Sequence, residues 1–303
     1  MPKIKVGHRF HPLASFFDYN INRNHGEKQE EDSAAQEGYW KTIGTFIPTG
    51  LPKNRAMTHL GRTLQTFLHA QEWREIPFMG NWSKIEEVPI PCPFLFLFDN
   101  HAFTALTYQH LASLFPSQVL FLIVLDTHLD IFPNQENSDT VNRGNFLRYL
   151  LTEGVIQEDH LLVTPLYDSI PRIQAGLARW GEGLYYLSWD LDFGLPQYAH
   201  FPSPLRIAFA DLRKIFQVLG HHFRKKGRYL VGMDIVEINL SRLHHPQQLA
   251  FQIAILLEGL HPQKIPPFLE TRLDRLLQEK YAVRERKRLF SGGCTAWKTA
   301  KRC

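Results

Sequence analysis

Four runs of this sequence are apolar at nearly every position, and they constrain the fold more than any other feature. A strand that is apolar throughout, rather than at alternate positions, is covered on both faces, which is typical of a parallel sheet. We predict buried strands at 94–98 (FLFLF), 119–125 (VLFLIVL), 184–188 (LYYLS) and 229–238 (YLVGMDIVEI).

Helical stretches lie between and after these runs, so that strand and helix alternate along the chain. We predict helices at 101–114, 145–153, 207–222 and 246–260. The alternation predicts an α/β fold in which a mainly parallel sheet lies between two layers of helices (α/β/α). We expect residues 1–303 to form a single such domain, with its motif-bearing core at about 94–260.

The two ends of the chain differ from this core in composition. We predict that residues 1–90 form an N-terminal extension, in which the polar and acidic segment 22–38 is a mobile loop. The segment 284–303 is basic and is predicted to be a tail. No stretch approaches about 18 apolar residues, and the three cysteines lack paired spacing, so we expect a cytoplasmic protein without a membrane segment.

Aspartates and histidines follow directly after three of the buried runs. The three sequences are DNHAF from Asp99, DTHLD from Asp126, and SWDLD from Ser188. In open α/β sheets the ligand site lies at the carboxyl ends of the strands. Carboxylates at the end of a buried strand are costly unless a positive charge compensates them, and a metal cation supplies that charge.

The spacing of these residues also suits a metal site. In extended backbone, alternate residues point to the same side, so Asp126, His128 and Asp130 can converge on one point. A lone aspartate in such a place is more often a helix cap, and only the combination favours metal binding. The six candidate ligands are His101, Asp126, His128, Asp130, Asp190 and Asp192. Six donors are too many for one tetrahedral zinc ion and suit two ions, and an oxygen-rich set without cysteine suits Mn²⁺.

These strand ends resemble the ureohydrolase superfamily, which includes arginase and agmatinase. The family signature has a histidine after the first motif strand, then DxHxD, then SxDxD, and this chain has DNHAF, DTHLD and SWDLD in the same order. A fourth segment, GMDIVEIN from Gly232, is similar to the family's late strand with a D-x-V-E core. The resemblance implies an arginase-like fold, whose sheet is shared with deacetylases.

The resemblance also implies a role for each ligand. His101, Asp126, Asp130 and Asp190 would hold one Mn²⁺, while His128, Asp126, Asp190 and Asp192 would hold the other, so that Asp126 and Asp190 bridge the two ions. The ions would ionise a shared water that attacks a guanidinium carbon. Glu237 would accept paired N–H bonds from that guanidinium. The catalytic candidates are therefore Glu237, Asp126 and His128, and Asp234 is expected to support the site without reacting.

The departures from the family pattern bear on the substrate. In the segment 142–148 (NRGNFLR), Asn145 matches a substrate-binding asparagine, but Leu147 stands where a proton-shuttling histidine is expected. The interval from Asp130 to Asp190 is 60 residues, which is short and predicts an open site. An open site without a clamp for a free amino acid favours an arginine side chain within a larger molecule. The chain thus resembles the peptide arginase branch, which converts arginine to ornithine and urea in a precursor peptide.

Three other functions remain open at this point. The first is a small-molecule ureohydrolase acting on free arginine, agmatine or another guanidino compound. The second is a deacetylase, a family that normally keeps one zinc ion, although the complete set of six ligands together with Glu237 argues against it. The third is a binding protein with structural metals, whose basic segments 224–228 and 284–288 contact nucleic acid or an acidic partner.

The partners follow from the same features. The net charge is only +4, so we expect no nucleic acid partner, and the lack of a long apolar stretch predicts no membrane partner. The resemblance to peptide arginases implies an arginine-containing peptide as the substrate. The family resemblance also implies a homo-oligomer.

Overall fold

The computed structural model of the chain describes residues 38–48, 55–78, 92–131, 141–164, 169–204, 206–266 and 275. The predicted mobile loop, except for Gly38, and the predicted basic tail lie outside these residues. Within the described residues, every helix is too short or too polar to span a bilayer.

Seven described strands pair in parallel to form one sheet, in the order β2-β1-β3-β7-β6-β4-β5. They are β1 (Thr42–Pro48), β2 (Glu72–Phe78), β3 (Phe94–Leu97), β4 (Leu120–Leu125), β5 (Leu161–Thr164), β6 (Gly183–Asp190) and β7 (Arg228–Val236). The four predicted runs became β3, β4, β6 and β7, which are neighbours in the sheet. Nearly all of their residues are buried, as continuous apolar runs require.

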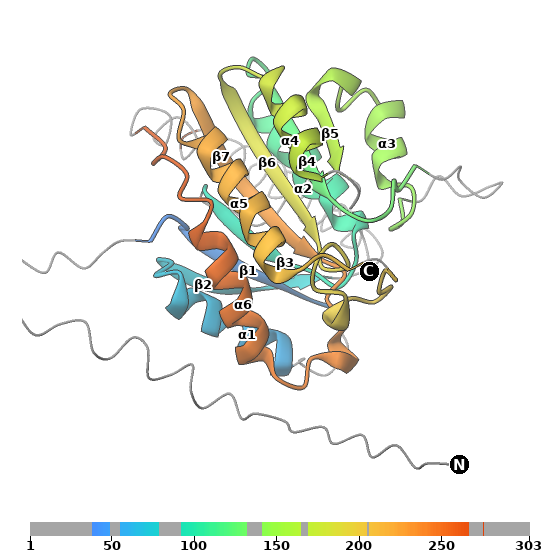
Figure 1. Cartoon of the computed structure of the whole chain (residues 1–303), viewed down its shortest axis with the longest axis vertical. Coiled ribbons are helices and arrows are strands. Elements are labelled where there is room, and N and C mark those ends of the chain that lie inside the picture. The colour runs from blue at the N-terminus through green and yellow to red at the C-terminus, as the bar shows by residue number, and fades with distance from the viewer. Residues whose placement is uncertain are drawn as a thin grey trace, which may run out of the picture. The chain divides into compact units, whose positions relative to one another are not determined.

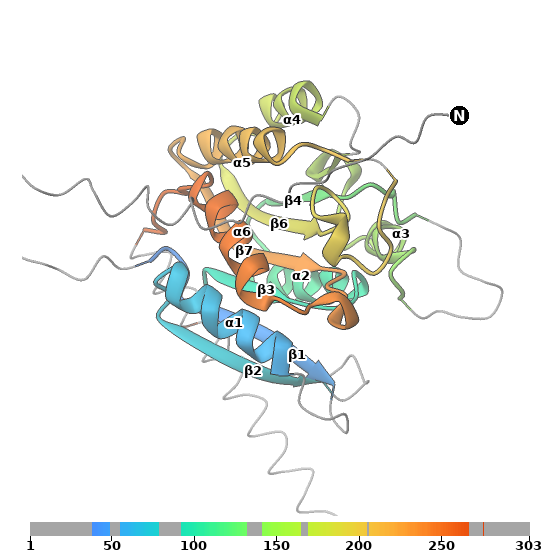
Figure 2. The same ribbon diagram turned by 60° about the horizontal axis from the view of Figure 1, so that its bottom comes forward.

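Helices cover both faces of this sheet (Figures 1 and 2). They are α1 (Arg55–Phe67), α2 (Ala102–Leu114), α3 (Phe146–Thr152), α4 (Ser169–Ala178), α5 (Phe209–Phe223) and α6 (Pro246–Glu258), with short 3₁₀ helices at Glu158–His160, Pro196–Tyr198 and Leu240–Arg242. Side chains of α1, α4, α5 and α6 share one hydrophobic cluster with one face of the sheet. Those of α2 and α3 share a second cluster with the other face. The predicted three-layer α/β/α architecture is therefore confirmed.

The sequence analysis missed several elements of this sheet. β1 and β2 arise within the region predicted to be an N-terminal extension, yet β1 lies between β2 and β3. β2 (EWREIPF) is an edge strand with charged residues, and β5 (LLVT) is a four-residue strand at the opposite edge. Short or charged edge strands lack the continuous apolar run by which a central strand is recognised.

The register of the sheet brings the predicted ligands together. Leu125, the last residue of β4, pairs with Trp189 of β6, so Asp126 follows beside Asp190. Asp190 in turn pairs with Val236 of β7, so Glu237 comes next along that edge. Because all three strands are parallel, their carboxyl ends meet at one edge of the sheet.

Candidate metal centre

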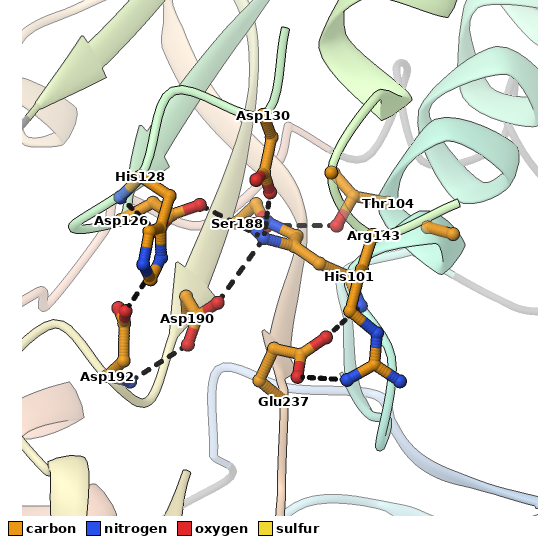
Figure 3. A network of polar contacts seen from close by, with 12 residues as sticks. His101, Thr104, Asp126, His128, Asp130, Arg143, Ser188, Asp190, Asp192 and Glu237 are labelled. Carbon is orange, nitrogen blue, oxygen red and sulfur yellow. Dashed lines mark hydrogen bonds and ion pairs between the residues drawn. The ribbon is translucent and has the colours of Figure 1, made fainter. Parts of the chain in front are cut away.

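His101 lies at the centre of the first group of ligands, just before α2 (Figure 3). Its ring is buried, and its Nδ1 lies 3.2 Å from Asp126 Oδ2, 3.0 Å from Asp130 Oδ2 and 3.4 Å from Asp190 Oδ2. The other ring nitrogen, Nε2, lies 3.1 Å from Ser188 Oγ. A hydrogen bond at one ring nitrogen orients the imidazole so that the other is presented to the carboxylates.

His128 forms the second group with Asp126 and Asp192. Its Nδ1 lies 3.4 Å from Asp126 Oδ1 and 3.0 Å from Asp192 Oδ2, and its side chain is 48% exposed. Asp192 is held in place by Thr127, whose backbone N–H donates to Oδ1 at 3.3 Å and whose hydroxyl donates to Oδ2. The second group is therefore more open to solvent than the first.

Both groups have the composition and geometry of metal sites. The ligand atoms of His101, Asp126 and Asp190 all lie within 4.8 Å of one another. The same holds for the ligand atoms of Asp126, His128 and Asp192. The buried atoms His101 Nδ1 and Asp126 Oδ2 lie 3.2 Å apart, but neither makes a well-aligned hydrogen bond within the described residues, as expected of atoms placed for a cation. Asp126 is common to both groups, as predicted of a bridging ligand. Asp190 belongs to the first group alone, so its bridging role remains a prediction.

Asp130 completes the predicted set through its contact with His101. Its backbone φ is +47°, and that of Glu237 is +59°. This left-handed region is unfavourable for residues other than glycine, at a cost of about 1–3 kcal/mol each. Strained backbone at two residues facing the same cleft is typical of a functional site.

The carboxylates of Asp126, Asp130, Asp190 and Asp192 strongly favour the binding of positive charge. Burial raises the pKa of Asp130 to about 6 and that of Asp190 well above its usual range. The carboxylates of Asp126 and Asp192 raise the pKa of His128 to about 11. Burial opposes protonation of His101, but its three carboxylate neighbours still raise its pKa. Two divalent cations would supply the charge that four carboxylates require.

Glu237 lies beside this cluster and is only 4% exposed. Its Oε1 accepts a hydrogen bond from the backbone N–H of His101 at 3.0 Å, and its Oε2 accepts one from Arg143 at 2.9 Å (Figure 3). The Arg143 guanidinium also lies over the ring of Phe201, 5.0 Å from its centroid. Burial raises the pKa of Glu237, and the charge of Arg143 partly offsets this.

A cleft of about 180 Å³ opens at this point. It is lined by His101, His128, Asp130, Arg143, Asp190, Phe201 and Glu237. Five of these seven residues are predicted site residues. Sequence reasoning missed the other two, Arg143 and Phe201, because nothing in their local pattern distinguishes them from loop residues.

The other substrate-binding candidate, Asn145, is not among the residues that line the cleft. It is buried at the start of α3, and its Oδ1 accepts a hydrogen bond from the backbone N–H of Asn142 at 2.7 Å. Leu147 is fully buried in the cluster beneath α3. In this segment it is therefore Arg143, and not Asn145, that faces the cleft.

Asp234 supports the cluster from within the sheet. It is fully buried in β7, and its Oδ2 accepts a hydrogen bond from the Tyr186 hydroxyl at 2.7 Å. Burial raises its pKa, partly offset by the hydroxyls of Ser188 and Tyr186. Since Ser188 also contacts His101, Asp234 is connected to the first group of ligands. Its supporting role remains a prediction.

The basic segment 224–228 lies at the other end of the sheet. Arg228 is the first residue of β7, and with Lys225 it lines a cavity of about 750 Å³ between α4 and α5. This cavity shares no lining residue with the cleft at the metal ligands.

Comparisons with known proteins connect this fold to solved structures. No protein-family profile matches the sequence, and no curated protein is similar to it. The structure is similar to Helicobacter pylori arginase (14% identity, TM-score 0.56, 74% of this chain and all of that chain). It is also similar to proclavaminate amidino hydrolase from Streptomyces clavuligerus (17%, 0.53, 74% of this chain and 92% of that chain) and to formimidoylglutamase from Bacillus subtilis (13%, 0.51, 84% of this chain and all of that chain). The chain therefore has an arginase-like α/β fold.

Proposed function

We propose that this chain is a metal-dependent hydrolase of guanidino groups that converts arginine side chains into ornithine and urea, within a peptide. One water is consumed: the bond between the guanidino carbon and the side-chain nitrogen breaks, and urea leaves. Six converging ligands, a buried carboxylate beside them and the arginase-like fold support this proposal.

The residues present fit two Mn²⁺ ions. His101, Asp126, Asp130 and Asp190 would hold one ion, and His128, Asp126, Asp190 and Asp192 the other. Four carboxylates and two imidazoles without a thiolate are a donor set that Mn²⁺ accepts. When bound, such ions act as Lewis acids and lower the pKa of water toward neutrality.

The observation that best supports guanidine chemistry is the contact between Arg143 and Glu237. A guanidinium group lies in the cleft, donates to Glu237 at 2.9 Å and packs over Phe201. The cleft therefore has the shape and charge to hold this functional group beside the metal ligands. Glu237 would orient the substrate through charge-assisted hydrogen bonds, which place the guanidino carbon near the cluster.

A peptide substrate is favoured over free arginine by two features of the cleft. Asn145, the residue that matches the family's substrate-binding asparagine, is not among the described residues that line the cleft, so this lining carries no match to a clamp for a free amino acid. Leu129 and Ile131, on either side of Asp130, are about half exposed, and Phe201 is exposed. Exposed apolar side chains around a cleft are typical of a surface that contacts a larger partner.

The test is incubation of the Mn²⁺-loaded protein with an arginine-containing peptide and, separately, with free arginine. We expect the peptide to lose a CN₂H₂ unit by mass spectrometry, with one urea released per arginine. Glu237→Gln should abolish this reaction, because the amide cannot neutralise a guanidinium. Glu258→Gln, at an exposed position of α6, is the matched control.

The second candidate is a small-molecule ureohydrolase, which the likeness to two solved arginases favours. Urea from free arginine, with the peptide unchanged, would establish this candidate instead. Absence of urea from every guanidino compound tried, with both metal ions bound, would rule out both.

A further inference from the structure

Arg143 occupies the place on Glu237 that a substrate guanidinium needs. Glu237 has two carboxylate oxygens: Oε1 accepts from the backbone of His101, and Oε2 accepts from Arg143. A guanidinium binds a carboxylate best through two parallel N–H bonds, one to each oxygen. An incoming guanidinium that makes this paired contact therefore competes with Arg143 for Oε2.

The charge balance of the cleft leads to the same conclusion. Glu237 carries one negative charge and is already paired with one guanidinium, that of Arg143. A second guanidinium beside Arg143 would add an uncompensated positive charge at a site where Glu237 is 4% exposed. Burial of an unpaired charge is strongly unfavourable. Arg143 and a substrate guanidinium are therefore expected to exclude each other.

The segment around Arg143 is suited to hold the side chain there and also to release it. The backbone is fixed by the hydrogen bonds from Asn142 N–H to Asn145 Oδ1 (2.7 Å) and from Gly144 N–H to Asn142 Oδ1 (2.9 Å). The Arg143 side chain is 38% exposed, and its other contact is the exposed ring of Phe201. It can leave Glu237 for solvent by rotation about its own bonds, without movement of a buried group.

We infer that Arg143 is a built-in competitor for the guanidinium subsite, occupying Glu237 until substrate displaces it. This inference rests on the proposed function of Glu237. Every guanidino ligand must displace Arg143, so its apparent affinity is reduced by the fraction of protein in which the subsite is free. If Arg143 occupies the subsite in 90–99% of molecules, removing it should tighten binding about 10- to 100-fold.

The experiment measures binding of the guanidinium ion itself to the Mn²⁺-loaded protein, by calorimetry at millimolar guanidinium chloride. Arg143→Ala should bind about 10- to 100-fold more tightly than the wild type. Arg143→Gln keeps the length of the side chain and should also bind more tightly. Arg148→Ala, which removes an exposed arginine of α3, is the matched control and should bind as the wild type does. Melting temperatures establish that each variant is folded.

Unchanged or weaker binding by folded Arg143→Ala would overturn the inference, and weaker binding would identify Arg143 as a ligand-binding residue instead. The two proposals fail separately. If the wild type releases urea but Arg143→Ala does not bind guanidinium more tightly, only the inference that Arg143 competes for Glu237 is refuted. Tighter binding by Arg143→Ala without urea from any substrate would support the competitor and refute the hydrolase.

Discussion

The two ends of the sheet each hold a buried histidine, and the two histidines have opposite protonation behaviour. At the carboxyl ends of the strands, carboxylates raise the pKa of His101 above its usual range. At the amino ends, burial and the charges of Arg228 and Lys225 together lower the pKa of His222 to about 3. His222 Nδ1 also contacts the Arg228 guanidinium at 2.7 Å.

The difference shows that the charges of neighbouring side chains, and not burial alone, decide whether a buried histidine is protonated. Both rings are buried, and burial by itself disfavours the charged imidazolium in each. Three carboxylates, those of Asp126, Asp130 and Asp190, reverse that preference for His101 at one end. Basic residues reinforce it at the other end, where His222 is a neutral acceptor for Arg228. The predictions below test this contrast.

The largest effect is expected from Asp126→Ala, because Asp126 belongs to both groups of candidate ligands. Both metal sites should be lost together, with a decrease of more than about 100-fold in metal affinity. Metal content after gel filtration, measured by mass spectrometry, is the readout. Asp211→Ala removes an aspartate that is paired with Lys214 and lies outside both ligand groups, so it should leave the metal content unchanged. Retention of two ions by Asp126→Ala would contradict the shared role.

Removal of metal should lower the stability of the whole domain. A ligand that binds only the folded state, present at about 1,000 times its dissociation constant, stabilises by about 4 kcal/mol. We therefore expect a chelator to lower the melting temperature of the wild type in thermal denaturation. The same chelator should have little effect on Asp126→Ala. An equal decrease in both proteins would mean that the metal acts elsewhere.

Asp234→Asn tests whether metal binding at the carboxyl ends of the strands depends on the buried carboxylate of Asp234. The amide keeps the size of the side chain and an acceptor for the Tyr186 hydroxyl but removes the charge. Loss of such a supporting group costs about 10- to 100-fold in metal affinity. Titration with Mn²⁺ measures this effect, and Asp234→Ala should be weaker still because the acceptor is also lost. Full affinity in both variants would show that Asp234 serves only packing.

The last effect concerns the amino ends of the strands and appears only when the pH is lowered. The folded-state pKa of His222, about 3, is below the unfolded value near 6.5, so the folded state binds fewer protons between these values. Its contribution to stability is therefore complete above about pH 6.5 and is lost as the pH falls toward 3, by about 1.4 kcal/mol per pH unit. His222→Gln, compared with the wild type in urea unfolding at pH 4, 5 and 7, should lose this dependence. The exposed His244→Gln should retain it.

The sequence by itself determined the fold class and the members of the acidic cluster. Continuous apolar runs identify buried parallel strands from local information, because a strand that is covered on both faces has apolar side chains at nearly every position. Asp126 and Asp190 could be placed at strand ends because they directly follow such runs. The charged edge strand β2 and the short β5 carry no such signal and were missed.

The tertiary structure alone decided which strands are neighbours and which side chains face the cleft. β7 is the last of the described strands, yet it lies between β3 and β6 and brings Glu237 to His101 across 136 residues. Strand order depends on pairing between distant segments, which no local pattern encodes. The direction of the Arg143 side chain depends likewise on a turn held by Asn145, so the residue that meets Glu237 could be recognised only in the folded chain.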